Sequence, residues 1–235
     1  MRGNTREVHS DSGRRRFLQT VLSTAVVGAA AQAGIGLAVP RRLSAQTNLS
    51  PDAALQELFA GNQRFAANQL TSLEHDLTVL REKTVDKQEP FAAVLSCADS
   101  RVPVELIFDQ TIGHIFVSRV AGNIVTPEII ASLEYGVAVL GVKALLVLGH
   151  SSCGAVKAAM KADVVPGQIS ALYAPLRQAV EQSGGSVDKA IEVNAKIQAG
   201  LLRTSSTVIR DAVKVGKLRV EAGVYDLATG KVTVS

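Results

Sequence analysis

From about residue 91 the chain alternates short apolar runs with longer segments in which apolar residues recur at helical spacing. The apolar runs at 91–98, 114–122 and 143–150 are short and continuous, as buried strands are. Helical segments and a closing hairpin about a Thr229-Gly230 turn follow at 126–141, 153–161, 168–182, 187–213 and 218–234. Strands that alternate with helices predict βαβ crossovers, so we expect an α/β fold with a mostly parallel β-sheet flanked by helices.

Residues 46–85 carry a different pattern, which predicts an N-terminal helical arm. Ser50 is placed to cap a helix, Pro51 falls in its first turn, and apolar residues then recur at helical spacing. A second short helix is expected from about residue 73 to residue 85. Both helices are amphipathic, so we expect the arm to lie on the core or on a partner subunit, where it would serve dimerisation.

Residues 1–45 are typical of an export signal. The basic stretch SGRRRFLQT precedes an Ala- and Gly-rich apolar run at 21–39, and RRLSAQ follows. The order Arg14-Arg15-x-Phe-Leu resembles the bacterial twin-arginine signal, which implies the twin-arginine translocation machinery as a partner and a periplasmic or otherwise exported protein. Cleavage is expected after Ala45 or within 31–33, and an uncleaved membrane anchor is the alternative.

Charge and length narrow the classes of protein further. The net charge is +4, but the first 45 residues hold seven arginines against two acidic residues, so the remaining chain is close to neutral. No basic stripe with interleaved aromatic residues follows, so nucleic-acid binding is not expected. At 235 residues, with a signal set aside, the chain has room for one sizeable domain, which we place at 86–235.

The two cysteines of the chain fall beside predicted strand ends. Cys97 ends the first strand, whereas His150 and Cys153, in GHSSCG, end the third. In an oxidising compartment an isolated pair of cysteines is often a disulfide. If the two strands are neighbours, however, the two thiolates and the imidazole converge and form a zinc site with its fourth position open.

Asp99 and Arg101, in LSCADSR, follow the first thiolate at intervals of two residues. A catalytic zinc ion acidifies bound water, although two thiolates cancel its formal charge. Asp99 is placed to accept the hydrogen bond of the resulting zinc hydroxide nucleophile and to aim it at substrate. Arg101 would keep Asp99 ionised through a charge-assisted pair. A disulfide would explain neither this pair nor His150.

The motifs CADSRVP, RVAGN, SLEYGV, VLGHSSCGAVKAA and GVYDLATGKV resemble those of the β-class carbonic anhydrases, over nearly all of the chain from about Ser50. The resemblance implies one Zn2+ per chain on Cys97, His150 and Cys153, with Asp99 as a further ligand in a closed state. It also implies reversible hydration of carbon dioxide to bicarbonate, an Asp99-Arg101 dyad, and a homodimer or a multiple of dimers.

The same resemblance extends to residues of a substrate pocket. Gln88 matches a glutamine that reaches substrate across the dimer interface, and Phe116, Ala121 and Tyr135 match positions that line a small apolar pocket. A solvated loop and ordinary core packing are the alternatives. His114 could relay protons, although a surface histidine of no special role is the simpler interpretation.

Two other functions remain open at the level of sequence. One is the same fold acting on another small cumulated substrate, such as carbon disulfide. The other is a noncatalytic zinc module used for binding or assembly. Export of a folded protein suits a metalloenzyme, because the metal can be loaded before the thiolates meet oxidants.

Overall fold

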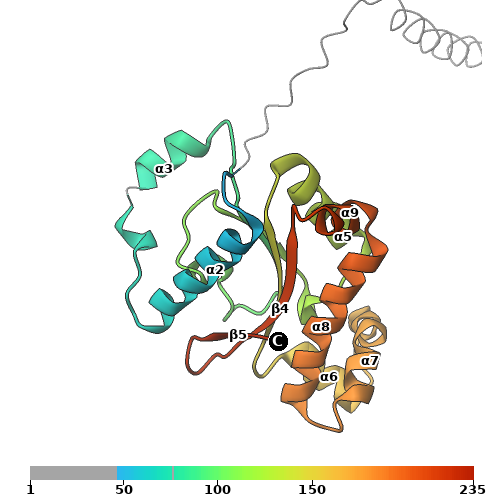
Figure 1. Ribbon diagram of the computed structural model, residues 1–235. Coiled ribbons are helices and arrows are strands. Elements are labelled where there is room, and N and C mark those ends of the chain that lie inside the picture. Colours follow the sequence, from blue (N-terminus) through green and yellow to red (C-terminus); the bar gives the residue numbers. More distant parts are fainter. Residues whose placement is uncertain (1–46, 76) are drawn as a thin grey trace, which may run out of the picture. The chain divides into compact units, whose positions relative to one another are not determined.

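A five-stranded sheet in the order β2-β1-β3-β4-β5 organises the computed structural model, which describes residues 47–75 and 77–235 (Figure 1). The strands are β1 Ala92–Ser96, β2 Ile115–Arg119, β3 Ala144–His150, β4 Arg219–Tyr225 and β5 Val232–Val234. All described pairings are parallel except that of β4 with β5, which forms the predicted closing hairpin. The prediction of a mostly parallel sheet is confirmed, whereas the predicted export signal lies outside the described residues.

Helices cover both faces of this sheet, as parallel strands require. The helical elements are α2 Pro51–Ala66, η1 Ser72–Glu74, α3 Leu77–Thr84, α4 Val104–Ile107, η2 Ala121–Asn123, α5 Pro127–Tyr135, η3 Gly136–Leu140, α6 Gly154–Lys161, η4 Ile169–Leu172, α7 Tyr173–Gln182, α8 Val187–Ser205 and α9 Thr207–Lys214. The segment at 187–213 divides into two helices because Ser206 caps the second, its hydroxyl accepting from the Ile209 N–H at 3.0 Å. Among the described residues no helix combines the length and apolar character that crossing a bilayer needs.

Alternate residues of the central strands face two separate hydrophobic cores. Val94 and Leu146 point to the face covered by α2 and α4. Leu95 and Val147 point to the face covered by α5, α8 and α9. Both faces of the central strands are therefore buried, and loops follow at the end of the sheet where β1 and β3 end.

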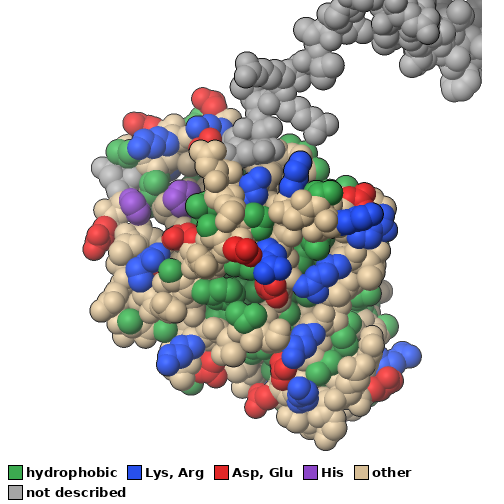
Figure 2. All heavy atoms as spheres, in the orientation of Figure 1, with side chains coloured by type: hydrophobic (Ala, Val, Ile, Leu, Met, Phe, Trp, Pro, Cys, Tyr) green, Lys and Arg blue, Asp and Glu red, His purple; other side chains and the backbone are tan. Residues whose placement is uncertain are grey.

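The surface of the protein carries charges of both signs. In Figure 2, basic and acidic side chains are interspersed over the face in view.

The first helix of the arm packs on the core of its own chain. Ala54 and Leu58 are fully buried in the core beneath α2. Gly61 approaches the next layer so closely that an added Cβ would lie 1.8 Å from the Phe108 carbonyl oxygen. In contrast, Leu73 in η1 and Leu77, the first residue of α3, are 72% and 61% exposed. The arm therefore has one part fastened to its core and one part with exposed apolar side chains.

A buried carboxylate fastens the chain between these two parts. Asp109 accepts hydrogen bonds from Arg64 Nε at 2.6 Å, from the Thr71 N–H at 2.9 Å and hydroxyl at 2.8 Å, and from the Ser72 N–H at 2.8 Å. Burial by itself would raise the pKa of Asp109, but these donors outweigh it and hold the pKa below its usual range. Asp109 therefore stays ionised and ties the arm to the loop after α4.

Asp109→Asn should destabilise the protein by about 2 to 4 kcal/mol, because it removes the anion on which Arg64 and three further donors converge. The measurement is urea unfolding of wild type and variant. Since the folded pKa of Asp109 is depressed, its contribution is present above pH about 4 and is lost as the pH falls, so the difference should narrow in acid.

The matched control is Asp211→Asn, which breaks an ion pair between two exposed side chains, Arg210 and Asp211. It should cost no more than about 0.5 kcal/mol. Equal effects of the two substitutions would mean that the Asp109 cluster has no special role.

Candidate metal centre

Two loops at the carboxyl edge of the sheet bring three metal-ligating side chains together. Cys97 follows β1 directly, His150 is the last residue of β3, and Cys153 is the residue immediately before α6. Their ligating atoms all lie within 4.8 Å of one another. The side chains are buried, with exposed fractions of 4%, 0% and 1%. The strands are neighbours, so the convergence expected from the sequence is confirmed.

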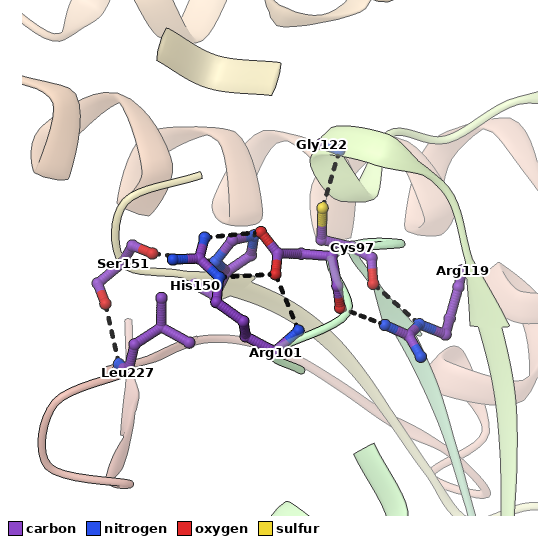
Figure 3. Close-up of polar contacts among 8 residues, drawn as sticks. Cys97, Arg101, Arg119, Gly122, His150, Ser151 and Leu227 are labelled. Atoms are coloured by element: carbon purple, nitrogen blue, oxygen red, sulfur yellow. Dashed lines mark hydrogen bonds and ion pairs between the residues drawn. The ribbon is translucent and has the colours of Figure 1, made fainter. Parts of the chain in front are cut away.

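The closing hairpin holds the tight turn between His150 and Cys153. The Ser151 N–H donates to the Tyr225 carbonyl oxygen at 2.8 Å. The Ser151 hydroxyl accepts from the Leu227 N–H at 2.9 Å, and this second bond is drawn in Figure 3. Ser152 adopts a left-handed conformation with φ of 59°. These hydrogen bonds offset the cost of that conformation and direct the Cys153 side chain toward Cys97.

The donor set fits a zinc ion. His150 Nδ1 lies 3.0 Å from the Ser151 carbonyl oxygen, which can only accept, so Nδ1 carries the proton and Nε2 keeps its lone pair. That Nε2 is buried and has no hydrogen-bond partner, a costly arrangement unless a metal uses it. The two cysteines are free thiols and form no disulfide. Two sulfurs and one imidazole nitrogen are ligands that zinc prefers.

The neighbouring groups shift the pKa values of the two thiols in opposite directions. The pKa of Cys97 is lowered well below its usual value by a hydrogen bond from the Cys153 thiol, helped by the Gly122 N–H, against the opposing effect of burial. The pKa of Cys153 is raised by its hydrogen bond to Cys97 and by burial. One thiolate is therefore already favoured, and a cation between the sulfurs would favour the second.

Asp99 and Arg101 form the expected dyad beside this cluster. Arg101 Nε donates to Asp99 Oδ1 at 2.9 Å and its Nη2 donates to Oδ2 at 2.8 Å, in a bidentate pair visible in Figure 3. Hydrogen bonding to Arg101 holds the pKa of Asp99 below its usual range. Asp99 Oδ2 is 3.8 Å from His150 Nε2, so the carboxylate borders the centre while engaged with Arg101.

Arg101 also lines an open cleft. The cleft has a volume of about 620 Å3, and its wall includes Ser151, Asp188, Val224 and Leu227. The side chain of Arg101 is 54% exposed there, whereas that of Asp99 is 17% exposed. The dyad therefore lies between the buried ligands and solvent.

Two residues that support the centre, Arg119 at the end of β2 and Gly122 in the loop after it, were not predicted from the sequence. Arg119 donates to the Cys97 carbonyl oxygen at 3.0 Å and to the Asp99 carbonyl oxygen at 2.5 Å, which fixes the loop that carries both residues. The Gly122 N–H donates to Cys97 Sγ at 3.3 Å. Both residues lie in the SRVAGN stretch. Because sites of parallel sheets gather at the carboxyl ends of strands, an arginine at the end of a predicted strand could have indicated a role at the site.

One chain brings only part of the predicted substrate pocket to the metal centre. Ala121 lies beside Gly122, next to the ligand Cys97. Phe116 and Tyr135 contact each other, with ring centroids 6.3 Å apart. Phe116 pairs in register with Ala93, four residues before Cys97, about 13 Å along the strand. The aromatic pair is therefore remote from the ligands of its own chain.

Gln88 and His114 lie near the opposite edge of the sheet. Gln88 is exposed in the loop before β1, and His114 immediately precedes β2. Burial, with the neighbouring His75, lowers the pKa of His114, whose Nδ1 lies 3.3 Å from Gln110 Oε1. Within one chain His114 is therefore too distant to relay protons for the metal centre, and Gln88 could reach a centre only in a second subunit.

Comparisons with known proteins agree on one family. The sequence profile described as carbonic anhydrase matches residues 92–232. Carbonic anhydrase 2 of Mycobacterium tuberculosis is 34% identical over 199 residues, covering 78% of this chain and 92% of the relative. A carbonic anhydrase of Pseudomonas aeruginosa is 36% identical over 162 residues, covering 62% and 73%.

Solved structures extend the likeness to the fold. A tetrameric β-carbonic anhydrase of Sordaria macrospora superposes with a TM-score of 0.63 at 25% identity, covering 77% of this chain and 95% of that one. A Coccomyxa β-carbonic anhydrase in complex with acetazolamide has a TM-score of 0.60 at 28% identity, covering 77% and 85%. The chain belongs to the β-class carbonic anhydrases, which are zinc enzymes.

Purified protein should contain about one zinc ion per chain, and Cys97→Ser, Cys153→Ser or His150→Ala should each remove most of it, since one of three strong ligands is lost. Elemental analysis measures the content. Ser96→Ala is the control, because Ser96 precedes Cys97 yet its buried hydroxyl has no partner. Full zinc content in Cys153→Ser would rule out this set of ligands.

Proposed function

We propose that this carbonic anhydrase binds zinc through Cys97, His150 and Cys153 and hydrates carbon dioxide reversibly at that ion, with Asp99 and Arg101 as its polar dyad. The single observation that carries the proposal is the buried, unpartnered Nε2 of His150 beside two free thiols. A noncatalytic zinc module would need no ionised dyad at the mouth of the centre. The test is hydration of carbon dioxide by the zinc-loaded protein, and zinc uptake without turnover would favour such a module.

Each partner of the dyad has a distinct role in this proposal. A zinc ion in such a centre acidifies water and so supplies a nucleophile near neutral pH. Asp99 stays ionised beside Arg101 and can only accept hydrogen bonds, so it orients a water molecule through its proton. Arg101 occupies both carboxylate oxygens of Asp99 and thereby keeps the carboxylate away from the ligands. We propose zinc ligation by Asp99 only when this pair is broken.

Arg101→Ala should keep its zinc but lose hydration activity by about 100-fold, because Asp99 is no longer held in its accepting position. Arg101→Lys should recover only part of the loss, since an ammonium group cannot form the planar bidentate pair. Stopped-flow hydration, with metal content measured on the same samples, separates loss of catalysis from loss of zinc.

Arg177→Ala is the matched control, because this exposed arginine lies on α7, away from the dyad. Its activity should equal that of wild type. Near-normal turnover in zinc-replete Arg101→Ala would show that the guanidinium has only a structural role.

We propose that a second copy of the chain completes the substrate pocket, in a homodimer or a multiple of dimers. Exposed Leu73 and Leu77 on the arm support an interface there. Gln88 and Tyr135 are also exposed. In such a dimer, Gln88, Phe116 and Tyr135 of one copy would face the centre of the other, beside its Ala121. The tetrameric Sordaria macrospora enzyme supports an oligomer.

We propose further that the protein is exported through the twin-arginine route, on the strength of the SGRRRFLQT sequence alone. Arg14→Lys combined with Arg15→Lys should then leave the unprocessed protein in the cytoplasm, with its activity preserved in the lysate. Fractionation of expressing bacterial cells measures the distribution. Arg41→Lys with Arg42→Lys makes the same charge-conserving substitution at a second arginine pair, and this variant should be exported normally. Undiminished periplasmic protein in the first double variant would exclude this route.

A further inference from the structure

A chain of buried amides connects helix α8 to the sulfur of Cys97. Gln198 Nε2 donates to Asn194 Oδ1 at 3.0 Å, and Asn194 Nδ2 donates to the Gly122 carbonyl oxygen at 2.9 Å. The Gly122 N–H in turn donates to Cys97 Sγ at 3.3 Å. Asn194 and Gln198 are 1% and 0% exposed. Figure 3 shows the last of these bonds entering the metal centre from the loop above it.

The two amides hold the η2 loop on both sides of its bend. Asn194 binds the carbonyl oxygen of Gly122, and Gln198 Oε1 accepts from the Val125 N–H at 2.8 Å. They lie four residues apart on α8, so both side chains project from the same face of the helix. The loop is thus fixed at two points three residues apart.

The loop would not favour this conformation by itself. Gly122 and Asn123 are consecutive left-handed residues, with φ of 75° and 43°. Glycine and asparagine tolerate left-handed backbone better than other residues, but Asn123 Nδ2 is also buried without a partner, which costs free energy. The loop conformation that places the Gly122 N–H against the sulfur of Cys97 therefore has a local cost in free energy.

Packing alone does not call for amides at these two positions. Residues beside them on α8, such as Ala195, Ala199 and Leu202, are buried and apolar. A leucine has the same branching as asparagine and carries no polar group whose burial costs free energy. Asn194 instead has both its oxygen and its nitrogen satisfied within this one chain of bonds.

We infer that Asn194 and Gln198 are positioning residues of the metal centre, which set the electron donation of Cys97 by holding the Gly122 N–H on its sulfur. A hydrogen bond to a thiolate draws electron density from it and weakens its donation to a bound metal. In a centre with two thiolates, weaker donation leaves the metal a stronger Lewis acid. The inference rests on the zinc site and the activity proposed above.

The test is the electronic spectrum of the full-length protein loaded with cobalt(II) in place of zinc. A thiolate on cobalt gives a near-ultraviolet charge-transfer band, whose energy falls when the sulfur loses a hydrogen bond. Asn194→Leu should shift this band to longer wavelength at unchanged metal content. The zinc-loaded variant should also lose about tenfold or more in kcat/KM. Gln198→Met should change both quantities in the same direction, and it provides the test if Asn194→Leu does not fold.

Leu202→Ala on the same helix is the control for destabilisation, because it opens a cavity in the core but leaves Asn194 and Gln198 in place. Its band should stay at the wild-type position. An unchanged band in a folded, cobalt-loaded Asn194→Leu or Gln198→Met protein, or an equal shift in Leu202→Ala, would overturn the inference. A wild-type protein without any thiolate band would instead refute the proposed ligands themselves.

Discussion

The direct parallel pairing of β1 with β3 is the constraint on which the rest of the centre depends. Ser96 pairs with Leu148, so the chain leaves both strands at the same edge, and Cys97 and His150 meet there. A slip of one residue would turn the Cys97 side chain to the other face of the sheet. The buried strands on both sides make such a slip costly, since every apolar side chain of β1 would change cores.

The loops at that edge are shaped by bonds from distant parts of the chain. The β4–β5 hairpin holds Ser151, Arg119 holds the backbone between Cys97 and Asp99, and α8 holds Gly122. Each contact stabilises a turn that includes or borders a left-handed residue or a buried ligand. The loops that carry the site are therefore held in place by hydrogen bonds from three other parts of the fold.

Metal binding and substrate binding place different demands on the single chain. The three ligands and the dyad lie within one chain, at one sheet edge, and need nothing from outside it. Gln88 and the Phe116–Tyr135 pair lie elsewhere in that chain, and their roles stay predictions. Because one chain supplies all three ligands, it would be able to bind zinc before it oligomerises. The proposed substrate pocket, in contrast, would form only when two copies assemble.

The sequence by itself determined the central strands and the candidate residues of the metal centre. Short apolar runs marked β1, β2 and β3, and the Cys-x-Asp-x-Arg and His-x-x-Cys spacings specified ligands and dyad, because periodicity and short spacings are local properties. Only the tertiary structure decided that α2 covers its own core and that His114 lies away from the metal centre. The same holds for Gly122 and Asn194, whose bonds join residues 25 and 72 positions apart. Such contacts depend on which elements become neighbours, and the neighbours are decided only when all strands and helices pack together.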